Sequence, residues 1–233
     1  PRFIHSEFMT HRMFSRNASS SRAIPVKRMI KQVAENPAMP IHWGKNQAGM
    51  QAREEIECPT LAQDVWKYAS ELAVDRAYEL KDLDTHKQIV NRILEPFQWI
   101  SVVVTATEWD NFFKLRLHKD AQPEIQELAR CMKTAMDESI PAELHPGEWH
   151  LPYVITNGGG SLEECIKMSV ARCARISFLN HDNSTPNIDK DIALADKLLE
   201  AGHMSPWEHI ATPMEFAKDT FELAWENGVT HKD

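Results

Sequence analysis

The sequence has few cysteines, and none of them forms a pair of the kind that binds zinc. Its 233 residues contain four cysteines, at positions 58, 131, 165 and 173, without a C-x-x-C motif. Scattered cysteines in a chain of this length predict a reduced, cytoplasmic protein rather than a disulfide framework. Nothing near Cys173 marks an activated nucleophile, so we expect a buried, unreactive thiol there.

Metal-binding patterns are also missing, although the chain has 11 histidines. His203 and His209 are six residues apart, as are His5 and His11, and neither pair has the i, i+4 spacing of a helical zinc motif. We therefore expect no metal site.

Long apolar runs are absent as well. The longest, ISVVVTA at residues 100–106, is far shorter than the roughly 18 residues that cross a membrane. No charged and then apolar leader is visible, so the expected location is the cytoplasm, without a membrane partner.

Charge is distributed unevenly along an acidic chain. The formal net charge is −8, which argues against a general nucleic-acid-binding protein. Residues 1–28 nevertheless carry six cationic side chains against Glu7 alone, a net +5, so the rest of the chain sums to −13. One basic segment in an acidic protein suits a small anionic ligand.

Apolar periodicity predicts helices over residues 1–13, 60–80, 85–94, 107–118, 121–137, 161–175 and 188–201. Residues 98–106 are rich in β-branched side chains and predict a strand. We expect Asp84 or Thr85 to cap the helix at 85–94, and Ser205 with Glu208 to form a capping box. Residues 28–58 read as irregular. Mixed helices with at least one strand predict an α/β or α+β fold.

Four polar segments are candidates for a site. Residues 10–22, THRMFSRNASSSR, hold three arginines and four serines, which suit a phosphate ligand or equally a solvated loop. Arg116 and Gln122 lie between two predicted helices, where they could enter a cleft or simply cap a helix and carry surface charge. The other two segments are ARCARISF at 171–178 and GHMSPWEH at 202–209.

Together these segments resemble the flavin-dependent thymidylate synthase family. Its signature, R-H-R followed by seven residues and a serine, is similar to Thr10-His11-Arg12 followed by Ser20, with Arg22 next. The family's ARVSY, HGHxSPxEH and LR…AQxEI segments look like residues 174–178, 202–209 and 115–125. In the family the first two of these precede R-H-R, whereas here they follow it. The chain therefore looks circularly permuted, with Gly158–Gly160 as the new joint.

The resemblance implies one thymidylate synthase-like domain over 1–233, an α/β fold with a mixed sheet and flanking helices. Residues 1–150 would be the nucleotide-binding core and 161–213 the permuted flavin-facing segment. The implied reaction converts dUMP to dTMP, with methylenetetrahydrofolate giving the carbon, FAD the hydride and NADPH reducing the flavin. The implied assembly is a homotetramer with active sites between subunits.

The resemblance also implies residue roles. Arg116, against the uracil ring, and Ser20 would be catalytic. The positions implied to bind the nucleotide are Arg12, Ser20, Ser21, Arg22, Arg92 and Arg116. The positions implied to face the flavin are His11, Asn111, Ser177, His203, Ser205 and Glu208.

Several family positions differ in this chain. Thr10 replaces the first Arg of R-H-R, Ala18 replaces a Glu, and Thr105 and Thr107 stand where flavin contacts are Asn and Arg. These changes imply a reshaped flavin pocket. They keep open a related reaction, transfer of a hydroxymethyl group to a pyrimidine nucleotide, which has no net redox demand. A non-catalytic nucleotide-binding or RNA-binding protein is the third alternative.

Overall fold

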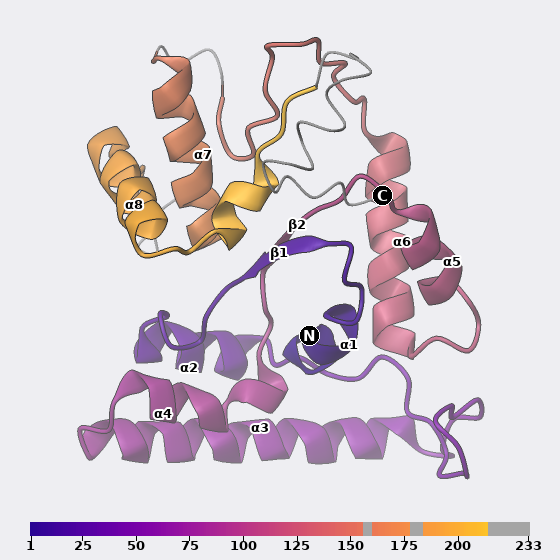
Figure 1. Ribbon diagram of the computed structural model, residues 1–233. Coiled ribbons are helices and arrows are strands. Elements are labelled where there is room, and N and C mark those ends of the chain that lie inside the picture. The colour runs from indigo at the N-terminus through magenta and orange to yellow at the C-terminus, as the bar shows by residue number, and fades with distance from the viewer. Residues whose placement is uncertain (156–159, 178–183, 214–233) are drawn as a thin grey trace. The chain divides into compact units, whose positions relative to one another are not determined.

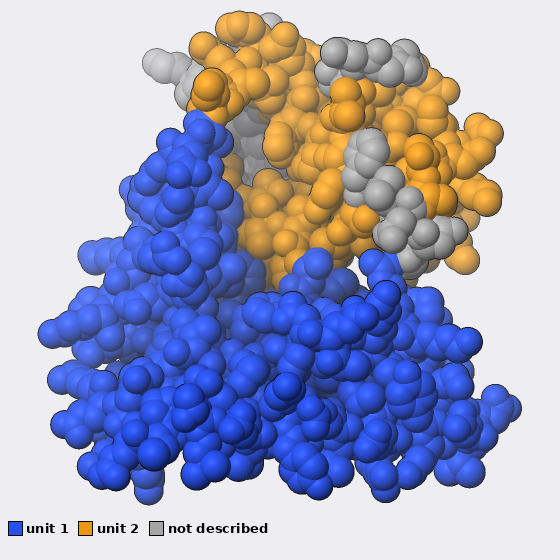
Figure 2. Space-filling view, turned by 180° about the vertical axis from the view of Figure 1, so that it is seen from behind, with its two compact units in different colours: residues 1–11, 19–101, 109–139 blue, residues 12–18, 102–108, 140–233 orange. Residues whose placement is uncertain are grey.

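The computed structural model describes residues 1–155, 160–177 and 184–213, which form two compact units. Unit 1 comprises Pro1–His11, Ser19–Ser101 and Trp109–Ser139. Unit 2 comprises Arg12–Ala18, Val102–Glu108 and Ile140–Asp233. Figure 2 shows the two units in different colours. Gly158 and Gly159 of the expected permutation joint, Phe178, and residues 214–233 lie outside the described residues.

Unit 1 is helical, and unit 2 combines helices with a small sheet (Figure 1). The elements of unit 1 are η1 (Arg2–Ile4), α1 (His5–Phe8), α2 (Val26–Glu35), α3 (Pro59–Asp82), α4 (Lys87–Ile93), η2 (Glu95–Phe97), α5 (Asp110–Arg116) and α6 (Pro123–Glu138). Those of unit 2 are β1 (Ser15–Ala18), β2 (Val102–Thr105), α7 (Leu162–Arg175), α8 (Ile188–Glu200) and η4 (Ser205–His209). Helices with a two-stranded antiparallel sheet agree with the α+β class.

The core of unit 1 forms where α2, α3 and α4 pack together. The long helix α3 presents its small side chains there, including Ala73 and Ala77, and small side chains let neighbouring helices approach closely. The buried partners from the other elements are Met29, Ile30, Val33, Val90, Leu94 and Phe97. This packing fixes the positions of α2 and α4 on α3.

The opposite side of α3 is unusual because its large apolar side chains are exposed. Leu61, Val65, Tyr68 and Leu72, spaced as one face of a helix, are between 43% and 63% exposed. The periodicity of this face correctly predicted the helix. The core nevertheless uses the other side, where Ala73 and Ala77 lie together with Trp66 and Leu80.

The sheet of unit 2 pairs β1 with β2, from Ser15 opposite Thr105 to Ala18 opposite Val102. β2 confirms the strand expected within residues 98–106. β1 was not expected, because its sequence SRNA carries no apolar alternation and its conformation depends on pairing with β2.

Two further helix predictions were wrong. Residues 28–58 are not irregular throughout, because α2 covers Val26–Glu35 with buried Met29, Ile30 and Val33. The amphipathic spacing of this helix was hidden by the polar composition of the segment. The helix expected over 1–13 is reduced to η1 and α1, since the chain leaves the helix after Phe8 to enter β1.

The predicted caps also differ. The N-cap of α4 is His86 rather than Asp84 or Thr85, and Asp84 adopts a left-handed φ of 56°. Ser205 opens a 3-10 helix without a side-chain cap, so no capping box forms with Glu208. A capping box does form at the start of α7, between Ser161 and Glu164.

A buried carboxylate joins α7 to α8 within unit 2. Asp191, 1% exposed, accepts hydrogen bonds from Arg172 Nε at 3.1 Å and from Arg175 Nη1 at 2.7 Å. Burying a carboxylate this completely would destabilise the fold if the two guanidinium groups did not compensate its charge.

Replacing Asp191 with alanine is expected to lower the free energy of unfolding by about 3–5 kcal/mol, because two largely buried arginines lose their counter-ion. Denaturant unfolding followed by circular dichroism measures the change. Asp196→Ala, on the same helix, is the matched control. Its partner is Lys167 at 3.0 Å and its side chain is 45% exposed, so its loss should stay below about 1 kcal/mol. Equal losses in the two variants would contradict this account.

Candidate functional site

Arg116, the last residue of α5, is held by three side chains from the start of unit 1. Its Nη1 lies 2.5 Å from Glu7 Oε1, its Nη2 donates to Thr10 Oγ1 at 3.1 Å, and its Nε donates to His11 Nε2 at 2.8 Å. The four residues form what we call the Arg116 cluster. Glu7, Thr10 and His11 come from α1 and the turn after it, where i, i+3 and i+4 positions lie on one side.

The bond to His11 defines the tautomer of that ring. A guanidinium nitrogen can only donate, so His11 Nε2 must accept, and the imidazole is neutral with its proton on Nδ1. The ring is 9% exposed and meets Phe112 edge-on, with centroids 4.9 Å apart. His11 is thus fixed by packing on one side and by Arg116 on the other.

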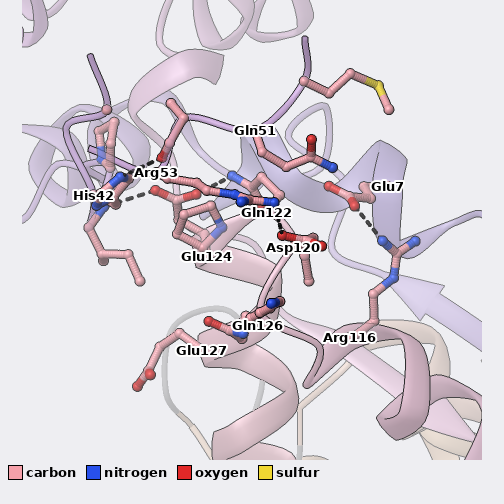
Figure 3. A pocket seen from close by; sticks show the side chains of 18 of the residues that line it. Glu7, His42, Gln51, Arg53, Arg116, Asp120, Gln122, Glu124, Gln126 and Glu127 are labelled. Carbon is pink, nitrogen blue, oxygen red and sulfur yellow. Dashed lines mark hydrogen bonds and ion pairs between the residues drawn. The ribbon is translucent and has the colours of Figure 1, made fainter. Parts of the chain in front are cut away.

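Arg116 and Glu7 open onto a pocket of about 1490 Å³ in unit 1 (Figure 3). Its other walls are the chain around Ile41–Arg53 and the first half of α6. Arg53 pairs with Asp120 at 3.1 Å, and the Ile41 amide donates to Glu124 Oε1 at 2.9 Å. These contacts attach the wall that precedes α3 to the start of α6.

The sequence left open whether Gln122 enters a cleft or caps a helix, and in the structure it does both. Its side chain caps α6 by accepting from the Ile125 amide at 3.2 Å. It also lines the pocket beside Glu124 (Figure 3). Capping and pocket lining therefore coexist at this residue.

The Ser-Arg segment after β1 forms a second cluster, a turn held by α4 and η2. Asn91, fully buried, donates to the carbonyl oxygens of Ser21 at 2.6 Å and Ile24 at 3.0 Å. The Ser21 hydroxyl donates to Glu95 Oε1 at 3.2 Å, and Lys87 Nζ reaches the Ala23 carbonyl at 3.3 Å. The three supporting residues are four positions apart, so they face the turn together.

The residues predicted to bind phosphate fall into two groups: one is already hydrogen-bonded inside the protein, and the others have side chains that are exposed. The Ser21 hydroxyl is committed to Glu95. Ser20, Arg22 and Arg92 are exposed, and their side chains make no hydrogen bond or ion pair within residues 1–155, 160–177 and 184–213. Figure 1 shows α4 and α5 on different sides of α1, so this turn and Arg116 are not brought together within unit 1.

The other predicted residues lie as follows. Asn111 is exposed in the first turn of α5. In unit 2, Arg12 is exposed just before β1, and His203, Ser205 and Glu208 are exposed at and beside η4. Ser177 follows Ile176, whose left-handed φ of 56° ends α7, an uncommon conformation for a β-branched residue. These roles stay predictions.

Three residues of the sites were missed from the sequence. Glu7 and Thr10 bond Arg116, and the i, i+3, i+4 spacing up to His11 was the available signal. His209, fully buried in η4, shares a hydrogen bond of 2.9 Å with Thr105 in unit 2. In the part of the chain that the structure describes, no three metal-ligating side chains gather, and no helix is long and apolar enough to cross a membrane.

These observations define an α+β protein with a pocket that has a clamped arginine at one end. The family model described as thymidylate synthase complementing protein matches residues 1–142, and the chain belongs to this family. A thymidylate synthase-like function follows from that membership. No curated protein and no solved structure matches the chain. The match covers Arg12, Ser20–Arg22, Arg92 and Arg116, whereas the segments at 174–178 and 202–209 lie beyond it.

Cys173 lies in α7 and is completely buried, and burial raises the pKa of its thiol to about 11. At pH 8 only about one thiol in a thousand would be ionised, so Cys173 should resist iodoacetamide in the folded protein. We expect its labelling rate to increase about tenfold per pH unit up to pH 11, and to become fast at pH 8 in urea. Mass spectrometry of the labelled peptide measures this. Rapid labelling of folded protein at pH 7 would show an activated thiol instead.

Proposed function

We propose that this protein converts dUMP to dTMP, with methylenetetrahydrofolate as carbon donor and FAD, reduced by NADPH, as the source of hydride. The observation that carries the proposal is the clamped Arg116 beside a pocket, in a chain of this family. The permuted arrangement, the family fold and a cytoplasmic location belong to the same proposal.

Arg116 would stabilise the charge that develops on the pyrimidine. Ring carbon 5 attacks as a nucleophile only after electron density has been pushed into the ring, and a fixed cation beside the carbonyl oxygens stabilises the enolate-like charge that results. Of the five N–H groups of a guanidinium, Glu7, Thr10 and His11 use three. Two remain for a substrate carbonyl.

The nucleotide phosphate would bind at the turn held by α4. The Ser20 hydroxyl and the guanidinium groups of Arg22 and Arg92 supply the charge-assisted donors that phosphate oxygens need. The Ser21 hydroxyl would first have to leave Glu95. The resemblance also implies a nucleotide contact by Arg12, which is exposed in unit 2.

The residues expected at the flavin fit that group chemically. Taken each in its own unit, the exposed His203 and Ser205 of unit 2 and the exposed Asn111 of unit 1 are donors and acceptors suited to the polar edge of a flavin. Bound FAD would supply the hydride that reduces the transferred carbon to a methyl group. The protein's part is to hold the ring and the pyrophosphate.

Hydroxymethyl transfer to a pyrimidine nucleotide is the second candidate, and one observation favours it. Thr10 and Thr105, which replace residues expected to touch flavin, have hydroxyls bonded inside the protein, to Arg116 and His209. Mass spectrometry of the product distinguishes the two reactions, since the added groups differ by one oxygen atom. Flavin absorbance of the purified protein would support the first candidate, the formation of dTMP.

Arg116→Lys is expected to reduce dTMP formation by about 10²-fold, because one ammonium cannot reproduce the fixed fork of donors. Initial rates with dUMP, methylenetetrahydrofolate, FAD and NADPH measure the loss. Lys114→Ala, on the exposed side of the same helix, is the control and should keep the wild-type rate. Wild-type protein that forms neither dTMP nor a hydroxymethylated nucleotide would overturn the proposed function.

We also propose a homotetramer with active sites between subunits. The exposed stripe Leu61, Val65, Tyr68 and Leu72 of α3 is a contiguous apolar surface of the kind that marks protein interfaces. Its 4-3-4 spacing is that of a helix–helix seam. Separation of the phosphate turn from Arg116 within unit 1 is also what a site shared between copies needs.

Val65→Asp in the middle of this stripe is expected to convert the tetramer into smaller species, because a carboxylate cannot be buried there without a partner. Light scattering after size-exclusion chromatography measures the mass. Lys67→Ala, an exposed change on α3 outside the stripe, should leave the mass unchanged. A wild-type monomer would contradict the assembly, and an unaffected tetramer would exclude this stripe.

A further inference from the structure

Thr10 stands where the family signature has an arginine, and its side chain is hydrogen-bonded within the protein. Its hydroxyl donates to the Glu7 carbonyl oxygen at 2.7 Å and accepts from Arg116 Nη2 at 3.1 Å. A hydroxyl has only one proton, so the bond to Glu7 turns its lone pairs toward the guanidinium. An arginine at this position would remove that acceptor and add a second cation beside Arg116.

Glu7 completes the arrangement from the preceding turn. Its carboxylate lies 2.5 Å from Arg116 Nη1, and the two side chains are 32% and 18% exposed. The ion pair therefore carries no net charge at this end of the pocket. With His11 on Nε, all three guanidinium nitrogens have a protein partner, which fixes the plane of the group.

We propose that Thr10, acting with Glu7, is a positioning residue for Arg116 and makes this end of the pocket select an uncharged, carbonyl-bearing ring over a phosphate. A phosphate needs net positive charge to replace its hydration, which a neutralised arginine does not offer. A carbonyl oxygen needs only one or two oriented N–H groups, and two are left. The identity of the ring as a pyrimidine rests on the proposed function.

The first test separates positioning from substrate binding. Thr10→Val keeps the side-chain shape without the hydroxyl, and Thr10 is exposed, so no core is disturbed. We expect kcat for product formation to fall about tenfold, with KM for dUMP changed less than about threefold, because orientation is lost rather than affinity. Thr10→Ser restores the hydroxyl and should recover most of kcat. Wild-type kcat in Thr10→Val, or an equal loss in Thr10→Ser, would overturn the proposal.

The second test addresses selectivity, with inorganic phosphate as the probe. Glu7→Gln removes the negative charge, so the positive charge of Arg116 is no longer compensated. We expect phosphate to inhibit this variant at a roughly tenfold lower concentration than wild type. Glu79→Gln is the matched control, since it removes a carboxylate that pairs with Arg76 on α3, and neither residue lines the pocket. Unchanged phosphate inhibition in Glu7→Gln would refute the selectivity.

A third measurement does not depend on turnover. In ¹H–¹⁵N spectra the Arg116 Nε–H signal, assigned by its loss in Arg116→Lys, should exchange slowly with water in wild type and in Thr10→Ser, and faster in Thr10→Val. Equal exchange in all three would show that Thr10 does not fix the guanidinium. If wild-type protein makes no product while this pattern holds, the proposed function fails and the positioning by Thr10 stands.

Discussion

The contact between Arg116 and Glu7 is the interaction on which the candidate site depends. A guanidinium that is 18% exposed has lost most of its hydration, which a nearby carboxylate and further acceptors replace. Glu7 supplies the charge, and Thr10 and His11 supply the acceptors. Because Arg116 ends α5 and its partners come from α1 and the following turn, the same contacts attach α5 to the start of the chain. Phe112, one turn earlier on α5, packs on Phe8 and His11 and supports this attachment.

Much of the helical content follows from the sequence, and the reasons for the exceptions are physical. α3, α6, α7 and α8 have periodic apolar residues over three or more turns, and their predicted spans agree with the structure within about two residues. β1 has four residues without apolar alternation and exists through its pairing with β2, which no local pattern encodes. α3 shows a further limit, because periodicity located the helix, but the apolar face from Leu61 to Leu72 that revealed it stayed exposed while another face became the core.

The candidate site shows the same division between local and non-local information. Motif spacing found Arg116, His11 and the Ser20–Arg22 turn. It could not find Glu7 as the partner of Arg116, since 109 positions separate the two in sequence. Asn91 and Glu95 were likewise missed as supports of the turn, although their four-residue spacing places them on one side of the chain. Residues that resemble a signature could be located, but the residues that orient them depend on the tertiary fold.

Two of the positions that differ from the family signature share one feature, a threonine hydroxyl that is hydrogen-bonded to a larger side chain of the protein. Thr10 in unit 1 and Thr105 in unit 2 each give a hydroxyl to a neighbouring side chain, Arg116 in one case and His209 in the other. A short hydroxyl cannot reach a ligand as arginine or asparagine can, but it can hold a larger side chain in place. Thr10 and Thr105 are therefore engaged inside the protein, and in the proposed function their part is to orient the residues beside a ligand rather than to contact it.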